Sequence, residues 1–181
     1  MAVLADDKRV GELIGTLAEA IGSAARGDDA PWALIGVRSR GDVLARRIAD
    51  RLGADRFEGR VGSLDLTLYR DDLSEIGPQA VVRTTEVPFP IDEVNVVLVD
   101  DVIMTGRSVR AALQSLMDLG RPRRVWLSVL VDRGGRELPI QPDHVALDLT
   151  RHDPPIEPNQ RVQVQLQPTD ERDAIELLTS E

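Results

Sequence analysis

A short segment of the chain combines two neighbouring acids with a glycine turn that carries hydroxyl groups. Asp100 and Asp101 follow the apolar stretch 96–99, and the sequence Thr105-Gly106-Arg107-Ser108 begins four residues after Asp101. The carboxyl end of a strand in an open α/β sheet borders the ligand crevice. A helix N-terminus offers unpaired amides and a positive dipole end to phosphate. The pattern therefore indicates a phosphate site with two carboxylates beside it.

The acids narrow the class of ligand. Carboxylates would repel a nearby phosphate unless a polyhydroxylated or cationic group lay between them. A ribose fits, because Asp100 and Asp101 can accept hydrogen bonds from its 2′ and 3′ hydroxyls while the turn holds the 5′-phosphate. The alternative is an acidic capping pair in a surface turn. Such turns are common, but the full spacing from strand to Ser108 favours the sugar phosphate.

The order of elements predicts where this segment lies in the fold. Apolar spacing predicts a helix over 6–25 capped by Asp6 or Asp7, and a second helix after 38–41 capped by Asp42. A third helix is predicted over 107–119, ending at Gly120. Buried strands are predicted at 32–37, 94–99 and 125–131, an alternating strand at 62–69, and a late strand at 162–166 paired with 175–178. Strand–helix–strand order with continuous apolar strands indicates an α/β, doubly wound, mainly parallel sheet flanked by helices.

Composition excludes several other classes of protein. The 181 residues suit one domain over 1–181, and 42% hydrophobic residues exclude a disordered tail. The absence of cysteine excludes disulfides and thiol catalysis, and it permits a reducing compartment without requiring one. We expect a cytoplasmic protein. No apolar run could cross a membrane, and the N-terminus lacks the pattern of a secretory signal. A net charge of −9 argues against indiscriminate binding to nucleic acid.

Segment 96–108 resembles the phosphoribosyl diphosphate signature of type I phosphoribosyltransferases. Further segments narrow the resemblance to the pyrimidine operon attenuator / uracil phosphoribosyltransferase family (PyrR). They are 65–73, 99–112, 119–122, 129–134 and 136–140, in the family's order. The similarity runs from about residue 32 to about residue 145. It implies the type I fold, with a loop or hairpin hood over the sheet.

The resemblance also implies an activity and a set of site residues. The activity is transfer of a phosphoribosyl group from phosphoribosyl diphosphate to uracil, giving UMP and pyrophosphate, with Mg²⁺ on the diphosphate. The implied catalytic residues are Asp100, Asp101, Arg40 and Arg133. The implied nucleotide-binding residues are Val102, Ile103, Met104, Thr105, Gly106, Arg107 and Ser108. No direct protein ligand to the metal is expected, although Asp100 or Asp101 would reach it through water.

Three further segments receive roles from the resemblance. The turn formed by Arg38, Ser39, Arg40 and Gly41 matches the pyrophosphate loop, against the alternative of a capping turn with exposed arginines. Tyr69, Arg70, Asp71, Asp72 and Arg83 match a mobile loop that closes over the reacting centre, against the alternative of a solvated charge run. Ile103, Met104, Val131, Asp132 and Arg133 match the base pocket, and the apolar members of this set could equally be ordinary core.

The family's second role, binding a leader RNA, is where the chain departs from the pattern. Gly135, Gln141, Leu147 and Asp148 stand where the family usually has His, Arg, Lys and Asn. The remaining basic residues are Arg121, Arg123, Arg124, Arg133 and Arg136. Each lost phosphate contact weakens binding to RNA. The alternatives are therefore a uracil phosphoribosyltransferase, a UMP-responsive RNA-binding regulator with weak transferase activity, and a transferase for another base. A homodimer or higher homo-oligomer is also implied.

Overall fold

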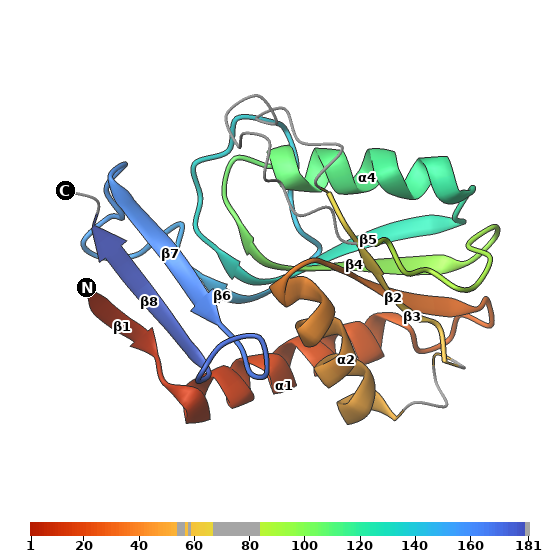
Figure 1. The fold of residues 1–181 in the computed structure, drawn as a ribbon, viewed down its shortest axis with the longest axis horizontal. Coiled ribbons are helices and arrows are strands. Elements are labelled where there is room, and N and C mark those ends of the chain that lie inside the picture. The colour runs from red at the N-terminus through yellow and green to blue at the C-terminus, as the bar shows by residue number, and fades with distance from the viewer. Residues whose placement is uncertain (54–56, 58, 67–83, 180–181) are drawn as a thin grey trace.

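A five-stranded parallel sheet forms the centre of the protein. The computed structural model describes residues 1–53, 57, 59–66 and 84–179. The strands lie in the order β3 (Val61–Leu64), β2 (Trp32–Val37), β4 (Asn95–Ile103), β5 (Arg124–Asp132) and β6 (His144–Asp148). Helices α1 (Asp7–Ala24) and α2 (Arg40–Leu52) lie on one face of this sheet, and α4 (Arg107–Leu119) lies on the other (Figure 1).

Alternating side chains of the central strands supply the two hydrophobic layers. Leu34 and Val97 belong to the cluster that includes the buried faces of α1 and α2. Ile35 and Leu98, one position along each strand, belong to the cluster that includes α4. Because successive side chains of a strand point to opposite faces, a continuously apolar strand needs a cover on both sides. The helices provide that cover.

The strand order reverses between β2 and β4. From β2 the chain passes through α2 to β3 at one edge, whereas from β4 it passes through α4 to β5 on the other side. Gly36 of β2 is paired with Val99 of β4, so the turn after β2 lies next to the acid pair. Such a reversal opens a crevice at the carboxyl ends of the strands, where ligands bind in open α/β sheets.

A small antiparallel sheet, called the hood here, lies beside those carboxyl ends (Figure 1). It consists of β1 (Ala2–Ala5), β8 (Ala174–Thr179) and β7 (Gln160–Gln165), with β8 in the middle. Val164 is paired with Ile175 across the β7–β8 hairpin. The predicted pairing of the last two strands, the doubly wound parallel sheet and the hood are therefore confirmed.

Several predicted boundaries differ from the observed ones. Helix α2 begins at Arg40, so Asp42 lies within its first turn and not at its cap. Strand β4 continues past the acids to Ile103, because β5 provides paired residues as far as Asp132. Strand β3 ends at Leu64, and residues 67–69 of the predicted strand lie outside the described residues. None of the described helices is both long and apolar enough to span a bilayer.

The sequence prediction missed two strands. Strand β1 has only four residues and exists through its pairing with β8, at the other end of the chain. Strand β6 is only half-buried and is paired with β5 alone. Neither segment has the long apolar run on which the prediction relied, so long-range pairing decides both.

Candidate functional site

A cavity of about 330 Å³, called the acid cavity here, lies at the strand-order reversal. Its walls come from the ends of β2 and β3, the turn before α2, the acid pair of β4 and the start of α4. The lining residues are Val37, Arg38, Ser39, Arg40, Asp65, Leu66, Asp100, Asp101, Val102 and Ser108. The turn and the acid pair, which the sequence separates by about 60 residues, thus share one cavity.

The two acids are held in the ladder of β4. Asp100 is 6% exposed, and its Oδ1 accepts a hydrogen bond from the Asp101 amide at 3.0 Å. Asp101 Oδ1 accepts from the Val102 amide at 2.9 Å. Burial raises the pKa of Asp100 well above its ordinary value, and the neighbouring Asp101 charge raises it further. Burial also raises the pKa of Asp101, against the opposing effects of the Val102 amide and the Arg40 charge.

Burying the charged carboxylate of Asp100 costs free energy, so we expect Asp100→Asn to stabilise the folded protein. At neutral pH we expect its free energy of unfolding to rise by about 1 kcal/mol, as for other relieved active-site strain. Protonation of wild-type Asp100 relieves the same cost, so the difference shrinks as pH falls through the raised pKa and vanishes below the ordinary value of 3.8. Urea unfolding of both proteins at several pH values measures this. A variant less stable than wild type at pH 7 would contradict the prediction.

A second cavity of about 80 Å³, called the phosphate cavity here, adjoins the N-terminus of α4. Its lining residues are Asp100, Val102, Ile103, Met104, Thr105, Gly106, Ser108 and Val109. Gly106 is the N-cap residue with φ 89°, a left-handed conformation that favours glycine. The Thr105 hydroxyl accepts a hydrogen bond from the Arg107 amide at 3.3 Å. The turn therefore directs the start of α4 and its amides toward a small cavity, as phosphate binding requires.

The turn before α2 presents two arginines with different partners. Arg38 donates from Nε to Ser63 Oγ at 2.9 Å and forms an ion pair with Glu86 at 3.0 Å. Arg40 donates from Nε and Nη2 to the two carboxylate oxygens of Asp170, both at 2.8 Å. Both side chains line the acid cavity. Arg38 is thus tied to β3 of the core, whereas Arg40 is tied to the hood.

A family comparison identifies this arrangement. The model of the phosphoribosyl transferase domain family matches residues 3–161. The chain belongs to this family. The resemblance inferred from segment 96–108 is therefore confirmed, and both cavities lie within the matched region.

Relatives named bifunctional protein PyrR share much of this phosphoribosyltransferase chain. One from Deinococcus radiodurans is 51% identical over 150 residues, covering 82% of this chain and 79% of its own. One from Thermus aquaticus is 50% identical, covering 82% and 80%. One from Bacillus cereus is 41% identical over 181 residues, covering 97% and 96%. The narrower resemblance to the PyrR family is thereby confirmed as well.

Solved structures confirm the phosphoribosyltransferase fold. The hypoxanthine phosphoribosyltransferase of Trypanosoma cruzi superposes with a TM-score of 0.69 over 100% of this chain and 98% of its own. Its sequence is 19% identical. At that identity the likeness concerns the arrangement of helices and strands alone.

Two arginines of the predicted phosphoribosyltransferase site have partners outside both cavities. Arg107 Nε forms an ion pair with Glu137 at 2.7 Å, and its side chain is about half exposed. Arg133 Nη2 donates to the backbone carbonyls of Glu157 at 2.9 Å and Gln160 at 2.8 Å. In this structure Arg133 therefore links the end of β5 to the start of β7, and its catalytic role stays a prediction.

Only part of the predicted base pocket lines one of these two cavities, and the rest lies at the end of β5 and in the loop that follows it. Ile103 and Met104 line the phosphate cavity, whereas Val131, Asp132 and Arg133 line neither cavity. Asp132 accepts a hydrogen bond from Arg136 Nη2 at 2.6 Å. Arg136 also donates to the carbonyls of Ile140 at 2.9 Å and Met104 at 3.0 Å. Arg136 therefore links Asp132, at the end of β5, to the backbone of Met104.

Other site residues were missed or lie outside the described residues. Asp65 lines the acid cavity directly after β3; because it follows a strand beside β2, the rule applied to Asp100 could have found it. Asp170 has no such signal, because it lies in a polar loop of the hood. Tyr69, Arg70, Asp71, Asp72 and Arg83 fall outside the described residues, and their role stays a prediction.

Proposed function

We propose that this chain transfers the phosphoribosyl group of phosphoribosyl diphosphate to uracil, giving UMP and pyrophosphate. The observation that supports this most strongly is that the two cavities share part of their lining. Asp100, Val102 and Ser108 line both of them. A ribose on the acid pair would therefore have its 5′-phosphate at the start of α4 and its diphosphate toward Arg38–Arg40. The similarity to PyrR proteins supports uracil over a purine as the base.

The residues of the site suit the charges that this reaction develops. Cleavage of the bond between C1′ and the diphosphate leaves a cation-like sugar and a highly charged leaving group. The carboxylates of Asp100 and Asp101 would stabilise the sugar, and Arg40 with the amides of the turn would stabilise the departing anion. The uracil nitrogen needs little activation by the protein, which agrees with the absence of cysteine.

The donor set also fits Mg²⁺. Asp65, Asp100 and Asp101 all line the acid cavity, and carboxylate oxygens are ligands that Mg²⁺ prefers. Within the described ranges, no cluster of three or more His, Cys, Asp and Glu residues could hold a metal by itself. We propose that the ion is carried by the diphosphate and that Asp100 or Asp101 would reach it through water. Such an ion would neutralise charge on the leaving group.

An assay with a panel of bases tests the proposal. Purified protein is incubated with phosphoribosyl diphosphate, Mg²⁺ and either uracil, cytosine, hypoxanthine or guanine, and the nucleotide product is measured. We expect UMP to be the main product, and expect its formation to stop when EDTA removes the metal. Faster formation of a purine nucleotide would assign the protein to a different transferase class.

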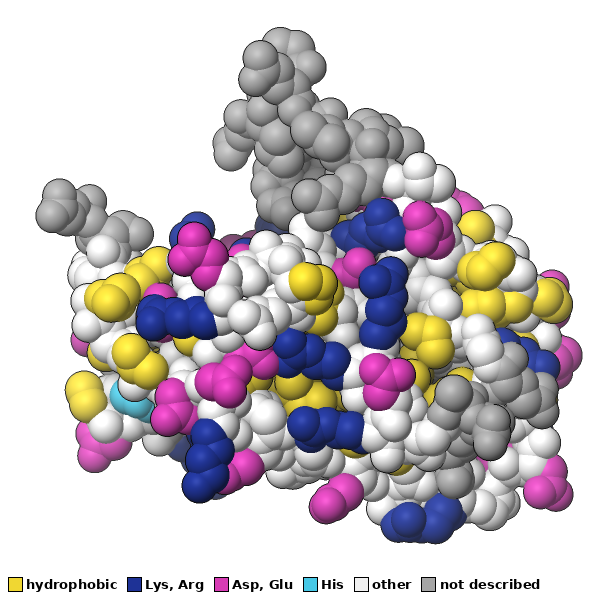
Figure 2. All heavy atoms as spheres, turned by 60° about the horizontal axis from the view of Figure 1, so that its bottom comes forward, with side chains coloured by type: hydrophobic (Ala, Val, Ile, Leu, Met, Phe, Trp, Pro, Cys, Tyr) yellow, Lys and Arg dark blue, Asp and Glu magenta, His cyan; other side chains and the backbone are white. Residues whose placement is uncertain are grey.

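Regulation of a leader RNA is the second candidate function, favoured by the similarity to proteins named bifunctional. Arg121, Arg123 and Arg124 are exposed together at the start of β5, but Arg133 and Arg136 are used in internal hydrogen bonds. Among the described side chains on the face shown in Figure 2, basic groups are interspersed with acidic and hydrophobic ones. Filter binding to the leader RNA at two salt concentrations tests this role. Absence of sequence-specific binding would exclude it.

A homodimer or larger homo-oligomer and a cytoplasmic location remain proposals that follow from the family. Sedimentation velocity at two protein concentrations tests the first, and a single species of about 20 kDa would contradict it. Fractionation of cells tests the second.

A further inference from the structure

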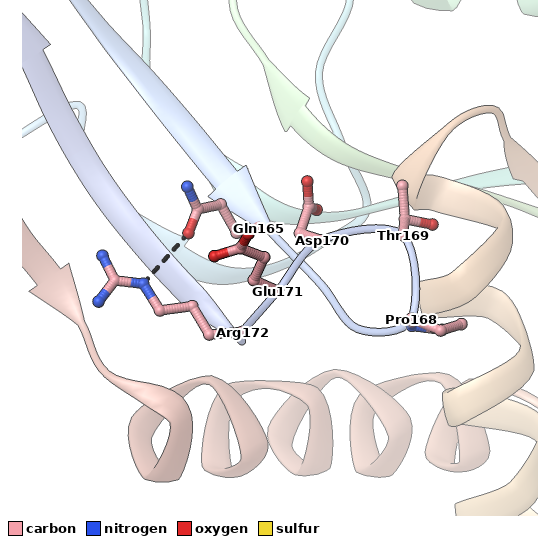
Figure 3. A pocket seen from close by; sticks show the side chains of 6 residues that line it. All are labelled: Gln165, Pro168, Thr169, Asp170, Glu171 and Arg172. Atoms are coloured by element: carbon pink, nitrogen blue, oxygen red, sulfur yellow. Dashed lines mark hydrogen bonds between the residues drawn. The ribbon is translucent and has the colours of Figure 1, made fainter.

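The loop between β7 and β8 docks onto helix α2 through two arginine–aspartate pairs. Asp170 accepts two hydrogen bonds from Arg40, each 2.8 Å long. Asp173 accepts two from Arg47, one of them at 2.9 Å from Nη2. Figure 3 shows this loop beside α2, with Pro168 near the helix and Asp170 projecting on the side away from α1; the loop residues also line a cavity of about 640 Å³. Two arginine–aspartate ion pairs therefore attach this loop of the hood to α2.

Only one of these two arginines borders the proposed diphosphate site. Arg40 lines the acid cavity and also a neighbouring cavity of about 350 Å³, whose other walls are Asp101, Val102 and β7. Arg47 lies two helical turns further along α2 and lines neither of them. The Arg47–Asp173 pair already docks the loop onto α2. Docking therefore does not explain why a second pair lies at the cavity wall.

The geometry of the Arg40–Asp170 pair fixes the direction of the guanidinium. A bidentate pair holds the planar guanidinium group in one orientation. The bonds engage Nε and Nη2, so Nη1 lies outside this pair and can donate to a ligand. Asp170 is itself held, because its Oδ2 accepts from the Leu166 amide at 2.7 Å and its own amide donates to the Leu166 carbonyl at 2.9 Å. Hydrogen bonding by Arg40 lowers the pKa of Asp170, so the carboxylate stays charged at neutral pH.

We propose that Asp170 is a positioning residue of the diphosphate site: it holds the Arg40 guanidinium at the cavity wall, ready to meet the leaving group. This inference rests on the proposed function, because it takes the turn Arg38–Arg40 as the diphosphate site. Asp170 belongs to the hood and is far from that turn in sequence. It would nevertheless determine how tightly the diphosphate is bound. Binding of UMP, whose phosphate would lie at α4, should not depend on Asp170.

The test is calorimetric binding of Mg²⁺–pyrophosphate, Mg²⁺–phosphoribosyl diphosphate and UMP to the full chain. For Asp170→Asn we expect the two diphosphate ligands to bind roughly tenfold more weakly, as after loss of one charge-assisted contact. UMP affinity should change less than about twofold. In the assay, KM for phosphoribosyl diphosphate should rise with kcat/KM falling in proportion, and Asp170→Glu should recover part of the loss.

Two control variants in the same loop distinguish positioning of Arg40 from docking of the hood and from a general change in charge. Asp173→Asn removes the other pair and should lower the melting temperature without changing pyrophosphate affinity. Glu171→Gln removes an exposed neighbouring charge and should change neither quantity. If Asp170→Asn does not fold, the Asp170→Glu variant decides by the same ratio of pyrophosphate to UMP affinity.

The affinity of Asp170→Asn for pyrophosphate distinguishes three roles for the Arg40–Asp170 pair. Tighter binding of pyrophosphate to Asp170→Asn would show that Asp170 competes with the ligand for Arg40, and unchanged binding in a folded variant would show that the pair only docks the hood. Either result overturns the inference. Failure of wild-type protein to bind phosphoribosyl diphosphate or to form UMP would instead refute the proposed function, and would be seen before any variant is compared.

Discussion

Asp101→Asn should lower kcat/KM for UMP formation by about two orders of magnitude, the size of effect found when one electrostatic contact to a transition state is removed. Asp101 lines the acid cavity and the neighbouring cavity of about 350 Å³, and Arg40 lines both of them too. Its carboxylate would accept a ribose hydroxyl and oppose the positive charge that develops on the sugar. Asparagine keeps the shape and the hydrogen bond from the Val102 amide, but it removes the charge.

The design separates loss of charge from loss of structure. Burial raises the pKa of Asp101, so removing its charge should not destabilise the fold. We therefore expect a melting temperature at least equal to that of wild type, with the loss mainly in kcat. Asp50→Asn, an exposed acid on α2, is the matched control and should keep full activity. Adding Thr105→Val should lower activity further through the 5′-phosphate. Undiminished UMP synthesis by the double variant would refute the site.

The parts of the site that local spacing alone predicts, without the family resemblance, lie within one continuous segment. Strand, acid pair, glycine turn and helix follow one another between 96 and 119, so local spacing determines how they are arranged. Helix α4 has the predicted bounds, because Gly106 can adopt the left-handed conformation that directs the chain into the helix. The doubly wound sheet follows from strand–helix–strand order for the same reason.

Contacts between distant segments could not be predicted from the sequence. Arg40 and Asp170 are 130 residues apart, and each is an ordinary polar residue in its own segment. The family resemblance implies a catalytic role for Arg133, but nothing near it in the sequence indicates that its guanidinium donates to the carbonyls of Glu157 and Gln160 beside β7. A long side chain such as arginine can reach several hydrogen-bond partners. The packing of the hood on the core determines which of them it contacts.

Replacing Gly41 with alanine should lower both stability and activity, because the turn Arg38–Gly41 lies close to β4 at this residue. A Cβ atom on Gly41 would lie 2.5 Å from the Val99 carbonyl oxygen and 3.3 Å from Asp100 Cα. Backbone atoms cannot move aside as a flexible side chain can, so alanine would push α2 and its turn away from the acid pair. We expect Gly41→Ala to lower the free energy of unfolding by about 1–3 kcal/mol, the usual cost of overpacking.

The same displacement predicts a loss of activity larger than the loss of stability would suggest. Moving the turn by about 1 Å relative to Asp100 and Asp101 would cost roughly a hundredfold in kcat/KM, because both halves of the substrate must be held at once. Gly11→Ala is the matched control: its Cβ would be 3.9 Å from the Arg51 guanidinium, and alanine within a helix should add about 0.5–1 kcal/mol. Urea unfolding and initial rates measure both effects. If Gly41→Ala retained wild-type rates, then close contact between the turn and β4 would not be what holds the diphosphate beside the ribose.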